Sequence, residues 1–396
     1  MGSKLVIFCE NTKDFFPKLK KISTFAPQMA GLYIHIPFCK SRCLYCDFYS
    51  TTSLDMRQRY VDALCRELDL RGKSGVDTIY IGGGTPSQLS FEQLQQLLLY
   101  IYKVCDVSPD AEVTMEVNPD DVTTAFAQAL PQLPINRISM GAQTFNDSRL
   151  QFLRRRHKAA QVPLAVERLR QAGIRNISVD LMYGFPNETL SEWDEDITAV
   201  LSLQVEHLSA YALQYEEGTP LYRLLQRGEV NEVDDELSRS MYYRLKDRLA
   251  DAGYEHYEIS NFARKGFRSR HNSSYWNQTP YIGIGAAAHS FDGHNRQWNV
   301  ANIRRYVEGK EKGTPVSEQE LLTPENHYNE VVMTALRTCE GLALDKLPLA
   351  YRDYCLKQSQ AFIDSGLLKV ENQHLVLSRE GLFVSDMVMT ELMHVS

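Results

Sequence analysis

Three cysteines stand close together near the start of the chain, in the stretch GLYIHIPFCKSRCLYCDFYS (residues 31 to 50). Cys39, Cys43 and Cys46 fall within eight positions, directly after a short apolar run that is typical of a strand. A loop at the end of a strand can bring three such thiolates to one face of a metal centre. The chemistry of this segment therefore depends on how many protein ligands the centre takes.

Three kinds of centre are open at this point. Structural zinc takes four ligands, and Asp47, His35 or the distant Cys65 could complete a zinc site, although no second Cys or His pair follows at zinc-finger spacing. A redox pair formed by the second and third cysteines would leave the first without a role. A cubane iron-sulfur cluster takes one thiolate per iron, so three thiolates would leave one iron open to an outside ligand.

The elements that must position this loop form a regular series. Short β-branched or aromatic runs alternate with amphipathic stretches that have apolar residues at three-and-four spacing, which predicts βα units and a parallel sheet. The predicted strands cover residues 32 to 36, 77 to 81, 112 to 117, 135 to 140, 176 to 183 and 207 to 213. Six units are too few for a closed eight-fold barrel. We therefore expect an α/β fold, a partial (β/α)6 TIM-like barrel whose working face is the C-terminal end of its strands.

The same pattern divides the chain into four segments. We expect an N-terminal extension over residues 1 to 28, the barrel over 29 to 255, an irregular aromatic connecting segment over 256 to 318, and a C-terminal domain over 319 to 396. In the last segment, three helices and a hairpin over residues 367 to 378, with its turn around Glu371 to Gln373, predict a small winged-helix-like α+β domain. Domains of this shape often bind DNA, so DNA binding is one possible role for this segment.

The composition of the chain argues against DNA binding. The 396 residues carry a net charge of −7 with a sequence pI near 5.9, so attraction to nucleic-acid phosphates is not expected to drive binding. No apolar run approaches the ~18 residues of a membrane-spanning helix, and residues 1 to 28 lack the apolar core of a signal peptide. The eight cysteines do not resemble a dense disulfide framework. We expect a cytoplasmic protein.

The spacing CxxxCxxC after the first strand resembles the signature of radical S-adenosylmethionine (SAM) proteins. In that superfamily the open iron of a [4Fe-4S] cluster chelates the amino and carboxylate groups of SAM. The segments IGGGTPS, MEVNP, ISMGAQTF, DLMYGFP and YIGIGAAAHS, with the cysteine stretch, resemble the oxygen-independent coproporphyrinogen oxidase-like branch over about residues 30 to 390. The resemblance implies a cluster on the three cysteines and SAM at the barrel mouth.

The resemblance also implies which residues contact SAM. Tyr33, Gly83 and Glu116 match positions that contact the cluster-bound SAM. Glycines allow close backbone approach, and a carboxylate can accept hydrogen bonds from ribose hydroxyls. Each polar residue could instead merely satisfy a strand-end loop. Further positions match contacts to a second SAM in the oxidase, and these are Tyr45, Gly84, Thr85, Gln143, Arg155 and Asp180.

Two features separate the groups of this branch. The oxidase carries a fourth cysteine two residues after the third, where this chain has Phe48. The stretch RHNSSYWN, with His271, Asn272, Tyr275 and Trp276, resembles the HNxxYW motif of the HemW group of haem chaperones. A histidine beside aromatic rings offers a nitrogen ligand for haem iron and flat apolar surfaces for a porphyrin. The alternative is that these rings only pack into the open side of the barrel.

The resemblance thus implies a protein that holds a [4Fe-4S] cluster and SAM, binds haem, and delivers it to acceptors such as respiratory enzymes. His289 in GAAAHS is a second histidine expected near the barrel mouth. The alternative function is an oxygen-independent coproporphyrinogen III dehydrogenase or another porphyrin-modifying enzyme, which would need an electron donor such as flavodoxin or ferredoxin. The sequence leaves open transient membrane association and a homodimer, and predicts no nucleic-acid partner.

Overall fold

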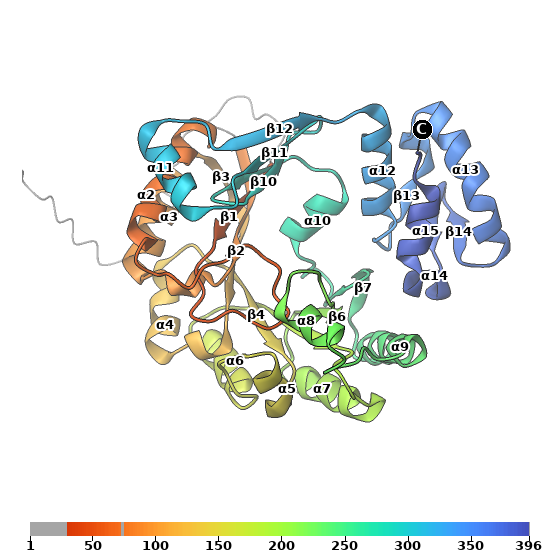
Figure 1. Cartoon of the computed structure of the whole chain (residues 1–396), viewed down its shortest axis with the longest axis horizontal. Coiled ribbons are helices and arrows are strands. Elements are labelled where there is room, and N and C mark those ends of the chain that lie inside the picture. Colours follow the sequence, from red (N-terminus) through yellow and green to blue (C-terminus); the bar gives the residue numbers. More distant parts are fainter. Residues whose placement is uncertain (1–29, 73–74, 396) are drawn as a thin grey trace, which may run out of the picture.

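The computed structural model describes residues 30–72 and 75–395. Its main body is one sheet of twelve strands in the order β12-β11-β10-β9-β1-β2-β3-β4-β5-β6-β8-β7. Helices lie along the outer face of this curved sheet, and the smaller C-terminal unit stands to one side (Figure 1). The extension predicted over residues 1 to 28 lies outside the described ranges.

The six predicted strands form a continuous parallel sheet. Their bounds are β1 (Ala30–Ile36), β2 (Gly75–Gly83), β3 (Asp106–Val117), β4 (Arg137–Gln143), β5 (Asn176–Tyr183) and β6 (His207–Ala212). Apolar side chains of these strands, such as Ile34, Ile79 and Ile138, are fully buried between the sheet and its helices. The predicted open α/β barrel is confirmed.

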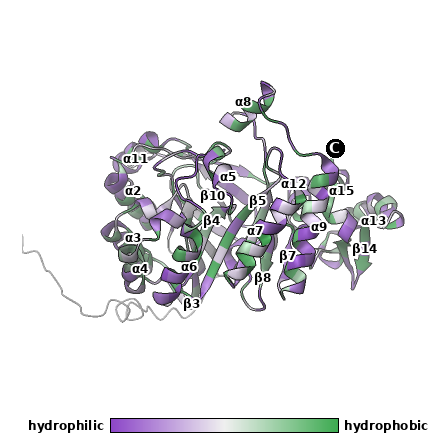
Figure 2. Ribbon diagram, turned by 90° about the horizontal axis from the view of Figure 1, so that it is seen from below, coloured by the Kyte–Doolittle hydropathy of each residue, from purple (hydrophilic) through white to green (hydrophobic). Residues whose placement is uncertain are grey.

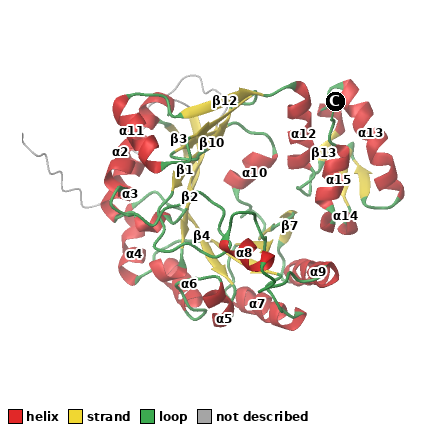
Figure 3. Ribbon diagram, in the orientation of Figure 1, coloured by secondary structure: helices red, strands yellow, loops and turns green. Residues whose placement is uncertain are grey.

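The helices between the strands cover the outside of the sheet (Figure 3). They are α2 (Arg57–Arg71), α3 (Phe91–Val104), α4 (Thr124–Ala129), α5 (Asp147–Phe152), α6 (Gln161–Gln171), α7 (Leu190–Ser202) and α9 (Asp235–Asp251), whereas α8 (Pro220–Gln226) projects from the body beside the cysteine loop. Hydrophobic and hydrophilic bands alternate along them (Figure 2), as expected for helices with one buried face. Capping boxes at Ser90 and Thr189 fix where α3 and α7 begin.

The connecting segment, which we expected to be irregular, is instead regular and extends the sheet at both edges. It contains β7 (Glu255–Glu258), β8 (Asn261–Ala263), α10 (Arg270–Trp276), β9 (Tyr281–Ile284), β10 (His289–Phe291), β11 (Asn295–Asn299), α11 (Ile303–Lys312) and β12 (Ser317–Leu321). Strand β9 pairs parallel with β1, and β8 pairs antiparallel with β6. Helix α10 lies between the barrel and the C-terminal unit (Figure 1).

The C-terminal unit has its own buried core, built around Tyr328, Val332 and Leu375. It consists of α12 (Pro324–Ala335), β13 (Leu342–Ala343), α13 (Leu349–Asp364), β14 (Leu368–Glu371), β15 (His374–Leu377), α14 (Arg379–Phe383) and α15 (Ser385–Leu392). The predicted hairpin is present, and its two-residue turn has positive φ at Asn372 and Gln373. Within the described ranges, no helix is long and apolar enough to cross a bilayer.

Candidate functional site

The cysteine loop follows β1 and is clamped at both its base and its tip. At the base, Cys39 N donates to Thr51 O at 2.9 Å. At the tip, Leu44 N donates to Leu153 O at 3.1 Å, and Leu44 O accepts from Leu221 N at 3.0 Å. The first bond closes the base of the loop locally, and the two bonds of Leu44 tie its tip to segments that are far away in the sequence.

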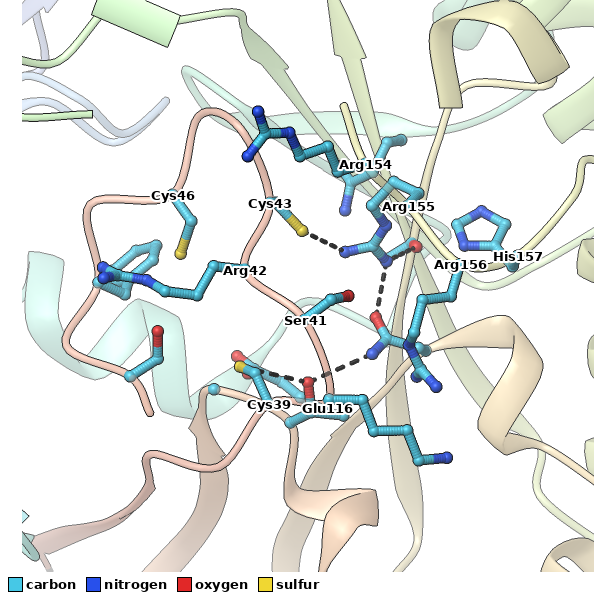
Figure 4. A pocket seen from close by; sticks show the side chains of 18 of the residues that line it. Cys39, Ser41, Arg42, Cys43, Cys46, Glu116, Arg154, Arg155, Arg156 and His157 are labelled. Atoms are coloured by element: carbon cyan, nitrogen blue, oxygen red, sulfur yellow. Dashed lines mark hydrogen bonds between the residues drawn. The ribbon is translucent and has the colours of Figure 1, made fainter. Parts of the chain in front are cut away.

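The loop closes over a cavity of about 200 Å³ at the C-terminal ends of the parallel strands. The thiols come from the cysteine loop, and Arg155 approaches Cys43 from the opposite side of this cavity (Figure 4). Apart from Tyr33, every residue predicted for the cluster or for SAM lines it. These residues are Cys39, Cys43, Cys46, Tyr45, Gly83, Gly84, Thr85, Glu116, Gln143, Arg155 and Asp180.

The three thiols lie near one another on the loop, and burial disfavours the charged form of Cys39 and of Cys46. Burial, together with the nearby thiols Cys43 and Cys39, raises the pKa of Cys46 to about 11, so the three groups lie close enough to repel one another as thiolates. Coordination to iron removes this penalty, because a bound thiol is deprotonated. Among the described residues, no three His, Cys, Asp or Glu side chains converge on one ion. The geometry gives the zinc alternative no support.

Arg155 links the thiols to the strand ends. Its Nη1 donates to Cys43 Sγ at 3.5 Å, and its Nη2 donates to Asn118 Oδ1 at 2.7 Å and to a backbone carbonyl of β4. Asn118 Nδ2 in turn donates to Thr85 Oγ1, which lies 3.8 Å from Cys39 Sγ. The sequence reading missed Asn118, although its position two residues after Glu116 was a usable signal.

Two carboxyl groups lie on the strands below the loop. Glu116 accepts from Tyr80 OH at 2.7 Å and from Gly83 N at 3.0 Å. Burial raises the pKa of Glu116 to about 7 and that of Asp180 to about 6, against the smaller opposing effect of hydrogen-bond donors. Because of these shifts, the two groups change protonation state near neutral pH.

Gly83 has a conformational reason to be glycine. Its φ of +109° is in the left-handed region, and an added Cβ would lie 2.5 Å from the ring of His35. That ring is fixed by Tyr33 OH at Nδ1 (2.9 Å) and by Tyr49 O at Nε2 (3.0 Å). Tyr33 does not line the first cavity but lines a second one.

The second cavity has a volume of about 620 Å³ and adjoins the first, because Phe48 lines both. Its walls are largely aromatic. They include Tyr33, Phe48, Tyr49, Tyr275, Trp276, Tyr281, His289 and Phe291, with Arg296 as a cation. Two of the three residues predicted to bind haem, Tyr275 and Trp276, are thus brought to one cavity beside the cysteine loop.

His271, the third predicted haem-binding residue, does not line this cavity. Its side chain is 1% exposed. The ring nitrogens are both hydrogen-bonded, Nδ1 to Thr78 Oγ1 and Nε2 to Tyr275 OH, each at 2.8 Å, and the ring stacks on Tyr80. Burial lowers the His271 pKa to about 3. A direct bond from His271 to haem iron stays a prediction, and it would require the loss of one of these hydrogen bonds.

Comparisons with known proteins agree with this geometry. A model of the radical SAM superfamily matches residues 33–200, and one of the HemN C-terminal domain matches residues 322–384. The heme chaperone HemW of Bacillus subtilis is 38% identical over 82% of this chain and 87% of that protein. The radical S-adenosyl methionine domain-containing protein 1, mitochondrial, of Bos taurus is 31% identical over 92% of this chain and 88% of its own.

Among solved structures, coproporphyrinogen III oxidase (HemN) from Escherichia coli matches with a TM-score of 0.80 and 20% identity, over 98% of this chain and 94% of that one. At this identity the likeness shows the shared fold. A cysteine loop at the mouth of an open α/β barrel with that fold makes this a radical SAM protein. Within the superfamily, its identity to the curated relatives over most of both chains means that it belongs to the heme chaperone HemW family.

Proposed function

We propose that this protein is a cytoplasmic haem chaperone that holds a [4Fe-4S] cluster and SAM in the first cavity, binds haem in the second, and delivers it to acceptor proteins. The observation that carries the proposal is that the two cavities adjoin. An aromatic cavity of about 620 Å³ borders the three-cysteine pocket through Phe48. Its volume is within the range of about 300–1,000 Å³ that small-molecule sites occupy.

In the first cavity, the thiolates of Cys39, Cys43 and Cys46 would each hold one iron. The cluster would supply an open iron for the amino and carboxylate groups of SAM. Glu116 and the backbone at Gly83 would bind the rest of that ligand. Arg155, hydrogen-bonded to Cys43 Sγ, would stabilise negative charge on the sulfur.

In the second cavity, flat rings from two distant parts of the chain would pack against the porphyrin. Phe48 is 64% exposed at the junction of the cavities, and an exposed large apolar side chain next to other rings is typical of a binding surface. Tyr275 and Trp276 enter from α10 on the other side. Arg296, whose Nε pairs with Glu330 and whose Nη1 donates to Tyr281 OH, would supply its Nη2 group to the haem propionates.

The test uses full-length protein reconstituted with iron and sulfide without air. Added hemin should give a shifted Soret band, and the loaded protein should transfer haem to apomyoglobin, as followed by the spectrum of the acceptor. Phe48→Asp should weaken hemin binding and leave the cluster absorbance intact. An unshifted Soret band in the wild type would reject the proposal.

A second candidate is radical SAM oxidative decarboxylation of coproporphyrinogen III, which the fold match to the Escherichia coli oxidase over 98% of this chain supports. This reaction would need an electron donor such as flavodoxin or ferredoxin. A dithionite-reduced assay with coproporphyrinogen III distinguishes the two candidates. Formation of protoporphyrinogen IX with 5′-deoxyadenosine favours the enzyme, and the absence of both products favours the chaperone.

A further inference from the structure

We propose that His289 supplies the imidazole that ligates haem iron in the second cavity, and that His271 acts behind it as a positioning residue for Tyr275. This inference rests on the proposed binding of haem. It assigns the iron ligand to a residue outside the HNSSYW stretch, at the first position of β10.

The surroundings of His271 fix it in place. To reach a haem in the cavity, its ring would have to leave a site where it is 1% exposed and give up a 2.8 Å hydrogen bond at one nitrogen. The Tyr275 hydroxyl, which lines the cavity, would lose its partner in the same step. Leaving a buried polar group unpaired is unfavourable. The geometry suits a residue that orients Tyr275.

His289 is in the opposite situation. Its side chain is exposed and lines the second cavity together with Phe48, Tyr275 and Trp276. The ring stacks against Trp298 at a centroid distance of 6.2 Å, and within the described part of the chain no hydrogen bond reaches either ring nitrogen. Partial burial and the neighbouring Arg296 lower its pKa, which keeps the imidazole neutral and its lone pair available, as iron ligation requires.

The turn directly before His289 is held by a buried carboxylate. Glu67 on α2 has no exposed surface and accepts from Gly285 N at 3.0 Å and from Asn299 Nδ2 at 2.9 Å. Asn299 N in turn donates to Ala288 O at 3.0 Å, one residue before His289. A ligand held on a rigid support loses less entropy on binding, so this arrangement is suited to metal coordination.

The test compares the spectra of ferric haem bound to reconstituted, full-length variants. His289→Ala should lose the low-spin, nitrogen-ligated absorbance and EPR signature, and added imidazole should restore it. His271→Gln, which keeps a hydrogen-bonding group beside Tyr275, should retain the signature. His294→Ala is the matched control, because His294 is also exposed on the same hairpin but does not line the cavity; its spectrum should equal that of the wild type.

The outcomes separate this inference from the proposed function. A nitrogen-ligated spectrum that survives His289→Ala overturns the inference, whichever residue then supplies the ligand. A loss of the signature in His294→Ala equal to that in His289→Ala also overturns it, since any exposed histidine would then serve. If the wild type binds no hemin at all, the proposed haem function itself fails.

Discussion

Replacing the buried carboxylate Glu67 with alanine should destabilise the protein strongly. Besides the contacts already described, Glu67 accepts from Tyr306 OH at 2.6 Å and from Lys310 Nζ at 3.1 Å, and it pairs with Arg71. The side chain of Lys310 is only 12% exposed, so the mutation leaves a buried cation without its partner. Removing one member of a buried ion pair costs about 3–5 kcal/mol.

This cost converts into a measurable temperature shift. A chain of 396 residues has an unfolding entropy of about 0.8 kcal/mol per kelvin at its midpoint. Glu67→Ala should therefore lower the melting temperature by about 4–6 °C, as measured by circular dichroism or scanning calorimetry. The turn between β9 and β10 should also exchange its amide hydrogens faster, because the Gly285 N–H loses its acceptor.

Glu311→Ala is the control for this experiment. Glu311 pairs with Arg59 on the surface, where the two side chains are 31% and 54% exposed. An exposed pair contributes about 0.2–1 kcal/mol, so its loss should lower the melting temperature by less than about 1.5 °C. Equal shifts in the two variants would refute the argument that burial of the Glu67 pair sets the cost.

Three further outcomes are expected. Cys46→Ser should abolish the four-iron EPR and absorbance signals, whereas Cys339→Ser, at an exposed thiol away from the loop, should leave them unchanged. SAM affinity, measured by equilibrium dialysis, should fall as the pH drops from 8 to 6, because protonation of Glu116, whose pKa is about 7, removes a hydrogen-bond acceptor. Glu116→Gln should bind weakly and lose most of the pH dependence between 8 and 7, where Asp180, whose pKa is about 6, stays ionised. Trp276→Ala should weaken hemin binding severalfold without changing the cluster signal, and equal affinity would count against the second cavity as the haem site.

The parallel barrel could be predicted because its strands are short apolar runs that end in polar residues. Such runs require burial on both faces, and the carboxyl ends of parallel strands meet at one edge. Residues as far apart as Gly83 and Asp180 were therefore expected together, and the structure places both in one cavity.

The outer strands could not be predicted because they lack this signal. Strand β12 has the sequence SEQEL and is almost entirely exposed, and β9 is a four-residue YIGI in which Gly283 leaves room for the backbone of His289. Their conformation is set by pairing with neighbouring strands rather than by local hydrophobicity. The stretch HNSSYW likewise indicated which residue types could bind a ligand. It could not indicate that His271 is buried, because the Thr78 side chain that contacts its ring comes from a distant strand.

The parallel pairing of β1 with β9 has a consequence for biosynthesis. The segment before the cysteine loop lies between β2 and a strand some 250 residues later, and Tyr49 OH just after the loop accepts from Ile303 N. A nascent chain emerges from the ribosome in order, and contacts of long sequence separation form last. The contacts that flank the thiols can therefore form only after residue 303 has been translated, and the cysteine loop reaches its final arrangement after that point.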